Sequence, residues 1–345
     1  MYRVVVTARR LPKSGSPLSE CEDATCPSPA ESGEGILPGE GISVAVADGA
    51  TTYSYSKEWA EIICREQAAL PMADATDLLA RLPGWQSTWA ESIEERVANL
   101  SWFAAAKVDQ GAFSTFLQLS LRPEGMQGGS WTALAVGDSC LVQCRNGKLV
   151  KRGDGSFVCF PLNSPEAFAA RPFLLPTRRE LIPRIAEHVC QTDGTWRPGD
   201  EFLLMTDALA AWFYSEVENG RNPMNILRIF LGRADSVTSE AIIVDDKEMM
   251  DSPVEPPTSG FLQNLLREKG YRRAHGAVRS AAAVLSTTTS STADCPKHDV
   301  QLSEHEILDG VFQTWAENMK AAGALKDDDV SFVHVLVVTA EGIHA

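Results

Sequence analysis

The chain has 345 residues, of which 44% are hydrophobic and 22% charged, so it can bury a sizeable core within one large domain. Its formal net charge of -15 argues against a nucleic-acid or anionic-membrane surface, because such partners require a basic patch. Excess carboxylate suits divalent cations instead, although an acidic surface is also ordinary for a soluble protein.

The cysteines and the apolar runs indicate a reducing environment away from membranes. Eight cysteines show neither a CxxC pair nor the spacing of a metal finger, so we expect reduced and mostly packed thiols. The apolar run near the N-terminus is too short for a signal peptide, and no other run is long enough to span a bilayer. We therefore expect a cytoplasmic protein that contacts no membrane.

A predicted strand over residues 2–8 opens the chain, and an irregular connection rich in Pro, Ser and Gly follows over residues 11–40. Residues 42–47 are β-branched and small apolar side chains, which predict a buried strand that stops at Asp48-Gly49. Amphipathic patterns predict helices over residues 54–69, 74–82 and 86 to about 102. Taken alone, an Asp-Gly pair after a strand is typical of a turn.

The middle of the chain changes to short β-forming runs. Strands are predicted over residues 113–121, 130–136, 140–145 and 148–152. Asn146-Gly147 is typical of a two-residue hairpin, which makes these strands an antiparallel meander. Residues 201–206 predict another buried strand, and this one also ends on an aspartate, Asp207.

The C-terminal third contains a compositional break. A helix is predicted over residues 222–232, and from about 235 to 305 the composition becomes acidic, then basic, then rich in Ser and Thr. Its mixed charge motivates the hypothesis that the segment binds a protein partner. A helix follows from Ser303 to Ala321, with a capping box at its start, and Asp327 to Asp329 lead into a final strand.

Carboxylates therefore stand at the edges of three predicted strands. Clustered carboxylates repel one another in a low dielectric unless cations neutralise them. Ligand sets of oxygen alone favour Mg²⁺ or Mn²⁺ over Zn²⁺, and two such ions can activate water for phosphate-ester hydrolysis. The candidate acids are Glu22, Asp23, Asp48, Asp207 and the run Asp327 to Asp329.

The order E-D, VADGA, GDS, LLMTDALAAW and DDVSFV resembles the metal-dependent serine/threonine protein phosphatase family of PP2C or PPM type, especially its bacterial members. The resemblance runs from about Leu18 to Val338 and skips residues 235–305, which look like an insertion by comparison with the family pattern. It implies an α+β fold, a four-layer α/β/β/α sandwich of two mainly antiparallel sheets flanked by helices. It also implies a single domain over residues 1–345, two Mn²⁺ or Mg²⁺ ions with a third in some members, and a phosphorylated protein as substrate.

The resemblance also assigns roles to individual residues. Asp48 would bridge both metals, Asp23 would orient the bridging hydroxide, and Glu22 would act on one metal through water. The remaining implied metal ligands are the Gly49 carbonyl, Asp207, Asp328 and, for a weaker third ion, Asp138.

Several positions depart from the family pattern. Ala50, Thr51 and Thr52 follow Asp48-Gly49 in place of further Gly or His residues, so a proton for the leaving group must come from water or another acid. Asp329 replaces the usual Asn, which would make the site more acidic or shift the ligand register by one residue. Ala208 replaces a Gly after Asp207.

The phosphate-binding Arg of the family is absent as well, since Leu18 stands at the expected spacing. Arg9, Arg10 or Lys13 could substitute, because a cation near the metals would hold the phosphate oxygens. We therefore expect weak phosphate binding. The missing Arg and altered Gly positions also favour an alternative function, a pseudophosphatase that keeps the fold as a binding or sensing module.

Other signals are interpreted as structural. Cys190 and Arg197 resemble a cysteine-phosphatase loop, but six residues separate them instead of five, and Asp193 would place an anion in the cradle. The eight tryptophans, among them Trp89 and Trp102 near helical spacing, are expected to lie in the core.

Overall fold

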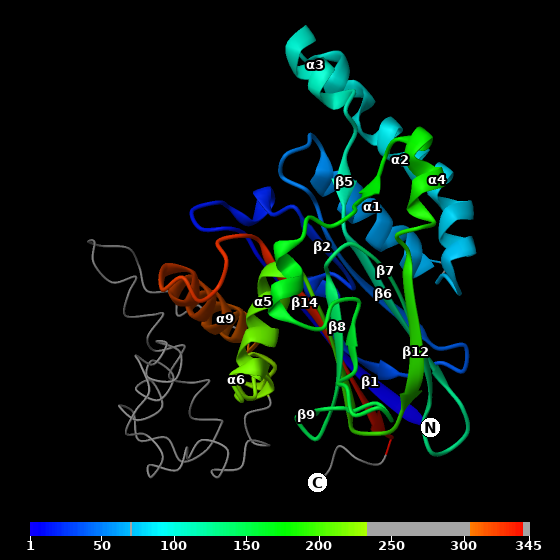
Figure 1. Cartoon of the computed structure of the whole chain (residues 1–345), viewed down its shortest axis with the longest axis vertical. Coiled ribbons are helices and arrows are strands. Elements are labelled where there is room, and N and C mark those ends of the chain that lie inside the picture. Colours follow the sequence, from blue (N-terminus) through cyan, green and yellow to red (C-terminus); the bar gives the residue numbers. More distant parts are fainter. Residues whose placement is uncertain (70, 233–303, 341–345) are drawn as a thin grey trace, which may run out of the picture. The chain divides into compact units, whose positions relative to one another are not determined.

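The computed structural model describes residues 1–69, 71–232 and 304–340, which are the coloured parts of Figure 1. The chain divides into two compact units. The first unit comprises Met1–Asn219 together with Asp328–Ala345, and the second comprises Gly220–Asp327. The predicted insertion at 235–305 lies outside the described residues except for its last two positions. The single-domain arrangement and the partner surface on that insertion stay predictions.

Two antiparallel sheets form the centre of the first unit. Sheet 1 has the strand order β10-β8-β13-β14-β1-β3, with β9 beside β8, and sheet 2 has the order β12-β7-β6-β4-β2. The strands of sheet 1 are β1 (Tyr2–Leu11), β3 (Gly33–Ile36), β8 (Cys140–Arg145), β9 (Lys148–Leu149), β10 (Cys159–Phe160), β13 (Asp200–Met205) and β14 (Val330–Thr339). Sheet 2 contains β2 (Asp23–Cys26), β4 (Ile42–Asp48), β6 (Phe116–Pro123), β7 (Gly129–Val136) and β12 (Cys190–Trp196).

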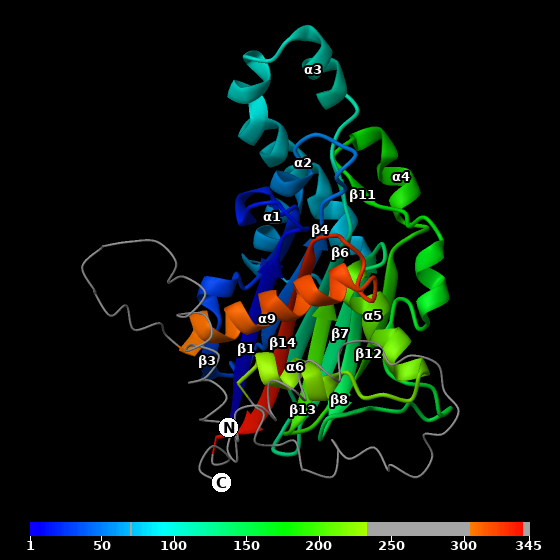
Figure 2. The ribbon, with the colours of Figure 1, turned by 90° about the vertical axis from the view of Figure 1, so that its left-hand side faces the viewer.

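A small third sheet and several helices complete this unit. A two-stranded sheet pairs β5 (Phe113–Ser114) with β11 (Leu175–Pro176). The α-helices are α1 (Ser56–Ala69), α2 (Ala75–Ala98), α3 (Trp102–Val108), α4 (Ile182–Ile185) and α5 (Asp207–Glu218). The 3-10 helices are η1 (Leu18–Glu20), η2 (Pro29–Glu31), η3 (Pro165–Ala169) and η4 (Arg179–Leu181). The first and last strands, β1 and β14, are direct neighbours, as Figure 2 shows in blue and red.

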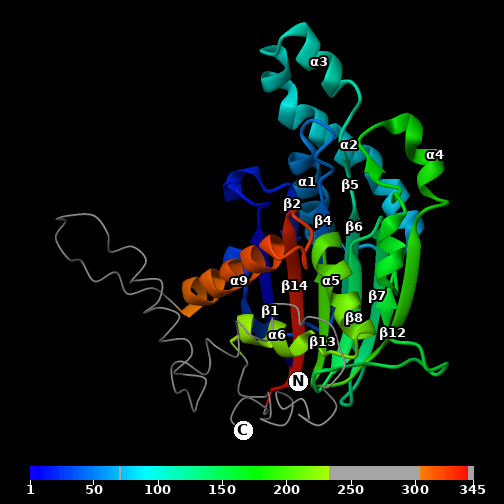
Figure 3. The same ribbon diagram turned by 60° about the vertical axis from the view of Figure 1, so that its left-hand side comes forward.

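Alternating side chains of β4 explain the layers. Val44 and Val46 belong to the core between the two sheets, whereas Ala45 and Ala47 pack in a second core with Trp59 of α1. Helix α5 contacts β13 and β14 of sheet 1 (Figure 3). The order of layers is therefore helices, sheet 2, sheet 1 and helix, which confirms the predicted α/β/β/α sandwich.

The predicted helix break at Pro83 was wrong. The sequence favours separate helices on either side of Pro83, but α2 continues through it. A proline inside a helix costs about 3 kcal/mol, because it removes a backbone donor and crowds the preceding turn. Burial of an apolar stripe on both sides of Pro83, which includes Leu78, Trp85 and Ile93, offsets this cost.

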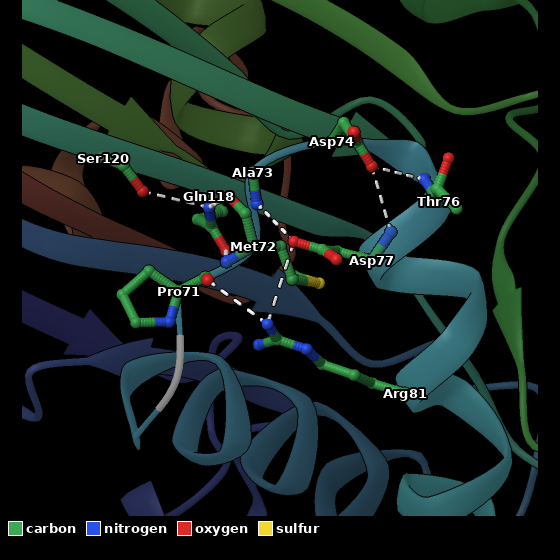
Figure 4. A network of polar contacts seen from close by, with 9 residues as sticks. All are labelled: Pro71, Met72, Ala73, Asp74, Thr76, Asp77, Arg81, Gln118 and Ser120. Atoms are coloured by element: carbon green, nitrogen blue, oxygen red, sulfur yellow. Dashed lines mark hydrogen bonds and ion pairs between the residues drawn. The ribbon is translucent and has the colours of Figure 1, made fainter.

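Figure 4 shows how the connection before α2 is held. The buried side chain of Gln118 in β6 accepts a hydrogen bond from Met72 N at 3.2 Å and donates one to Met72 O at 2.9 Å. It therefore pairs with the connection as a neighbouring strand would. Asp74 then caps α2 by accepting bonds from Thr76 N and Asp77 N, at 2.8 and 3.0 Å.

The connection predicted over residues 11–40 is more ordered than expected. It contains β2 and β3, and β12 was also missed. Four residues such as Asp23–Cys26 are too short to show alternation, and their strand character comes from pairing with β4. Other boundaries shifted as well, since residues 113–121 form β5 and part of β6, and only Lys148–Leu149 of residues 148–152 form a strand.

The second unit contains two described helices, α6 (Met224–Phe230) and α9 (Glu304–Ala321). Phe230 packs against Phe312 and Trp315, with ring centroids 5.3 and 5.2 Å apart. This aromatic contact confirms both predicted helices as packed elements. Ser303, the predicted first residue of the capping box, lies outside the described residues.

Seven of the eight tryptophans are at most 7% exposed, and all eight lie among the described residues. Trp102 is the exception, since it is 84% exposed next to Phe103 on α3. The expectation that Trp102 lies in the core was therefore wrong, because α3 leaves this face of the helix open to solvent. Among the described residues, no helix has both the length and the apolar character that crossing a bilayer requires.

Candidate active site

The antiparallel register brings the ends of several strands to one place. In sheet 1, Met205 at the end of β13 pairs with Phe332 near the start of β14 and with Cys140 at the start of β8. Asp207, Asp328 and Asp138 lie just beyond these strand ends. In sheet 2, the first residue of β2 pairs with the last residue of β4, which places Asp23 directly opposite Asp48.

Side-chain hydrogen bonds join the two sheets at this end. Thr206 Oγ1, which follows β13, donates to Asp23 Oδ2 at 3.0 Å. The hydroxyls of Thr115 and Ser139, which adjoin β6 and β8, lie 2.7 Å apart. The candidate acids of the two sheets therefore gather at the same end of the sandwich. Sequence reasoning missed these hydroxyls, although Thr206 is a typical residue to precede a helix.

Asp48 is the centre of the group. Its backbone N–H donates to Thr115 Oγ1 at 2.9 Å, and its carbonyl accepts from Ser114 Oγ at 2.8 Å, so the backbone is held on both sides. Burial raises the pKa of the Asp48 carboxyl well above its ordinary value, and the charges of nearby carboxylates raise it further. Those carboxylates are Asp23, Asp207, Asp328 and Asp138.

Asp23 is fully buried and only partly satisfied. Burial raises its pKa well above the ordinary value, and the charges of Asp329 and Asp207 add to the effect. Asp23 Oδ2 accepts the Thr206 bond, whereas Oδ1 is buried with no hydrogen-bond partner. An unpartnered buried carboxylate oxygen is costly, so this position favours a bound donor or cation.

Glu22 combines an acid with neighbouring polar groups. Burial raises the pKa of its carboxyl, as do the charges of Asp329 and Asp328, while a Thr51 hydroxyl bond and Lys13 lower it. Lys13 Nζ lies 4.0 Å from Glu22 Oε2. Thr51, where the family pattern has other residues, therefore contacts Glu22 in this chain.

The three cations considered as replacements for the missing Arg differ in position. Arg10 donates through its guanidinium to the Asp23 backbone carbonyl at 3.0 Å, so it supports the strand. Arg9 is 2% exposed. Lys13 is about one-third exposed and faces Glu22, which makes it the best placed of the three to contact a ligand.

Both oxygens of the extra acid Asp329 are engaged by the backbone. Its two carboxylate oxygens accept hydrogen bonds from the backbone N–H groups of Lys13 and Glu22, at 2.7 and 2.6 Å. Asp328 is the more exposed of the two acids, and its Oδ1 accepts a bond from Asp329 N at 3.0 Å. Asp328 therefore remains the candidate ligand at the start of β14.

Gly49 is required by close backbone approach. A Cβ at this position would lie 2.8 Å from the Glu22 carbonyl oxygen and 2.8 Å from the Ser56 carbonyl oxygen. Gly49 N also donates to Glu22 O at 3.2 Å. The absence of a side chain therefore lets the connection before β2 approach the end of β4.

Gly49→Ala is expected to lower the free energy of unfolding by about 1–3 kcal/mol, because backbone atoms must move to admit the methyl group. Gly39→Ala is the matched control, since nothing lies within 4 Å of its added Cβ. Urea denaturation of both variants beside the wild type measures the difference. Equal losses in the two variants would contradict the close approach at Gly49.

The donor chemistry fits a hard divalent cation. The candidate ligands offer only oxygen atoms, and one buried oxygen of each of two acids, Asp23 Oδ1 and Glu22 Oε2, has no hydrogen-bond partner. In the described part of the chain, however, no three His, Cys, Asp or Glu side chains come close enough to form a preassembled metal site. Mutual repulsion of the acids is consistent with such a spread arrangement.

No protein-family model and no curated protein matches the chain. Among solved structures, it is similar to the catalytic domain of serine/threonine protein phosphatase PstP in complex with 2 manganese ions, with a TM-score of 0.45 and 14% identity over 98% of this chain and 100% of that chain. It is also similar to Mycobacterium tuberculosis PstP/Ppp (TM-score 0.42, 14% identity, 98% and 99% covered) and to Pseudomonas aeruginosa PppA (0.39, 15%, 97% and 99%). These likenesses are in fold.

Proposed function

We propose that this chain is a phosphoprotein phosphatase that hydrolyses phosphoserine or phosphothreonine with the help of two Mn²⁺ or Mg²⁺ ions. The observation that carries the proposal is the convergence of carboxylates from both sheets around Asp48, whose pKa is raised by burial and by four neighbouring acids. Such a cluster is unfavourable by itself and favourable around divalent cations. The motif order that resembles the PP2C family supports the same activity.

The residues divide into ligands and supporting groups. Asp48, Asp207, Asp328 and the Gly49 carbonyl would hold the ions, with Glu22 acting through water and Asp138 available to a weaker third ion. When bound, the ions would neutralise the cluster and supply Lewis-acid activation of water and of the phosphate ester. Asp23, opposite Asp48 and anchored by Thr206, would orient the attacking water by accepting its hydrogen bond.

Lys13 is the proposed contact for substrate phosphate. As a flexible point charge, it lacks the bidentate geometry of the family's Arg, so the phosphate affinity of the wild type is expected to be weak. Lys13→Ala is expected to raise KM for a phosphothreonine peptide about 10-fold, equivalent to about 1.4 kcal/mol, with a smaller effect on kcat. Steady-state kinetics with inorganic phosphate as inhibitor tests both statements. A low-micromolar inhibition constant for the wild type would contradict the weak affinity, and an unchanged KM in Lys13→Ala would contradict the phosphate contact.

The proposal is tested by assaying the purified full chain on a phosphothreonine peptide with Mn²⁺, with Mg²⁺ and with a chelator. Phosphate release that requires the metal is the expected result. Calorimetric titration of Mn²⁺ into the protein gives an independent measure of the ions bound. The phosphatase would be rejected if the folded chain showed no metal-dependent phosphate release and bound no Mn²⁺.

The alternative function is a pseudophosphatase that binds or senses a partner through the same fold. Two observations favour it, namely the missing phosphate-binding Arg and the absence of a preassembled metal site in the described residues. A folded chain that neither hydrolyses the phosphothreonine peptide nor binds Mn²⁺ would select this alternative.

The partner and the location follow from the same proposal. The substrate would be a phosphorylated protein, with no role for nucleic acid, since the net charge is -15. The seven cysteines in the described ranges are free thiols, which agrees with a reducing compartment such as the cytoplasm.

A further inference from the structure

Asp329 is a buried carboxylate with an unusual pair of partners. It lies just before β14 and is 5% exposed. One oxygen accepts the N–H of Lys13 at 2.7 Å, and the other accepts the N–H of Glu22 at 2.6 Å. Both distances are short, as expected when backbone donors meet an ionised acceptor.

These two bonds close a loop. The chain leaves β1 at Leu11, passes through Lys13 and η1, and returns at Glu22 to begin β2. Both ends of this loop are thus held by one carboxylate from a strand about 300 residues away, and Lys13 Nζ ends 4.0 Å from Glu22 Oε2. A shift of Asp329 would therefore move Glu22 and Lys13 together.

The chemistry of the two donors requires a carboxylate. An ionised Asp is an acceptor at both oxygens, whereas an Asn of the same shape has one acceptor and one NH₂ group. In Asp329→Asn, that NH₂ would face a backbone N–H, and one buried donor would lose its partner. The geometry of the loop thus accounts for an Asp at this position, where the family pattern has Asn.

We propose that Asp329 is a positioning residue that sets the separation of Glu22 and Lys13, and through them the affinity of the site for metal and phosphate. It holds the loop through backbone hydrogen bonds, and its charge also acts on Glu22 and Asp23. The consequence for catalysis rests on the proposed phosphatase function, whereas the clamp itself does not.

The variants are Asp329→Asn, which keeps the shape, and Asp329→Ala, which removes both bonds. Asp74→Ala is the matched control, because Asp74 also accepts two backbone N–H groups, at the start of α2. Hydrogen–deuterium exchange of the metal-free full chain measures the amides of residues 12–22 without any need for activity. Mn²⁺ calorimetry and steady-state kinetics on a phosphothreonine peptide follow.

For Asp329→Asn we expect exchange in residues 12–22 to accelerate about 10-fold, while exchange in β14 and β4 is unchanged. The Mn²⁺ dissociation constant and KM are expected to rise about 10-fold, with a smaller change in kcat, and Asp74→Ala should change neither. Unchanged exchange in Asp329→Asn would overturn the clamp. Faster exchange with Mn²⁺ affinity and KM equal to those of Asp74→Ala would overturn the positioning role.

A wild type that hydrolyses no phosphopeptide would remove the proposed function, and exchange together with Mn²⁺ calorimetry would still decide the clamp. If Asp329→Ala does not fold, the isosteric Asp329→Asn supplies the result.

Discussion

Asp48→Asn is expected to lower kcat/KM for Mn²⁺-dependent hydrolysis of a phosphothreonine peptide about 1,000-fold, equivalent to about 4 kcal/mol of transition-state stabilisation. Asp48 lies at the centre of the acids from both sheets. Four neighbouring carboxylates all act on its charge, namely Asp23, Asp207, Asp328 and Asp138. An amide of the same shape keeps one oxygen donor and removes the negative charge that would hold a divalent cation.

Asp207→Asn is expected to cause a loss of similar order, because Asp207 enters the cluster from sheet 1 at the start of α5. Asp109→Asn is the control, since Asp109 is an exposed carboxylate at the end of α3. Stopped assays over a range of Mn²⁺ concentrations separate weaker metal binding from a slower chemical step. Wild-type rates in Asp48→Asn at all Mn²⁺ concentrations would contradict the proposed ligand role.

The second large effect is expected in the stability of the metal-free protein. The pKa values of Asp48, Asp23 and Glu22 are raised by folding, mainly through burial, so these groups bind protons in the folded state that they release in the unfolded state. Their contribution to stability is fully present below the unfolded pKa, about 4. It is lost as pH rises through the folded values.

Accordingly, with a chelator present, the free energy of unfolding is expected to fall between mildly acidic and neutral pH, and Asp48→Asn is expected to fall less. At pH 7 the metal-free Asp48→Asn variant should be more stable than the wild type by about 1–3 kcal/mol, because one of several mutually repelling charges is gone. Mn²⁺ at about 100 times its dissociation constant should add about 2.7 kcal/mol to the wild type.

Urea denaturation of wild type and Asp48→Asn at pH 5, 6, 7 and 8, with chelator or with Mn²⁺, measures these differences. The comparison between the two proteins isolates Asp48 from the other acids that titrate. A wild type whose metal-free stability rises steadily toward pH 8, in parallel with Asp48→Asn, would contradict the raised pKa.

The parts of the site that the sequence predicts are those with a local pattern. Asp48 follows the six-residue run 42–47, and Asp207 comes shortly after the apolar run Phe202–Met205, so both the strand and the acid at its end are visible. The two-sheet architecture follows from the change to short strands with turn residues between them. Helix boundaries were less predictable, because packing of Trp85 and its neighbours overrides the breaking effect of Pro83.

Long-range contacts account for the rest. Asp329 and Glu22 are 307 residues apart, and Asp23 and Thr206 are 183 apart, so no local pattern reports their bonds. The sequence therefore presents Asp329 as one more acid in a run. Only the fold shows that Asp329 binds backbone N–H groups, whereas Asp328 is more exposed. For the same reason, the choice among Arg9, Arg10 and Lys13 needed the geometry around β2.

The distribution of the tryptophans also simplifies the intrinsic fluorescence of the protein. Seven indoles are shielded and Trp102 is open to solvent, so an ionic quencher such as iodide quenches the fluorescence of one side chain, at the start of α3. The remaining emission reports on the cores, which contain Trp59, Trp131 and Trp196. A single sample therefore carries separate signals for the start of α3 and for the buried tryptophans, with no label attached.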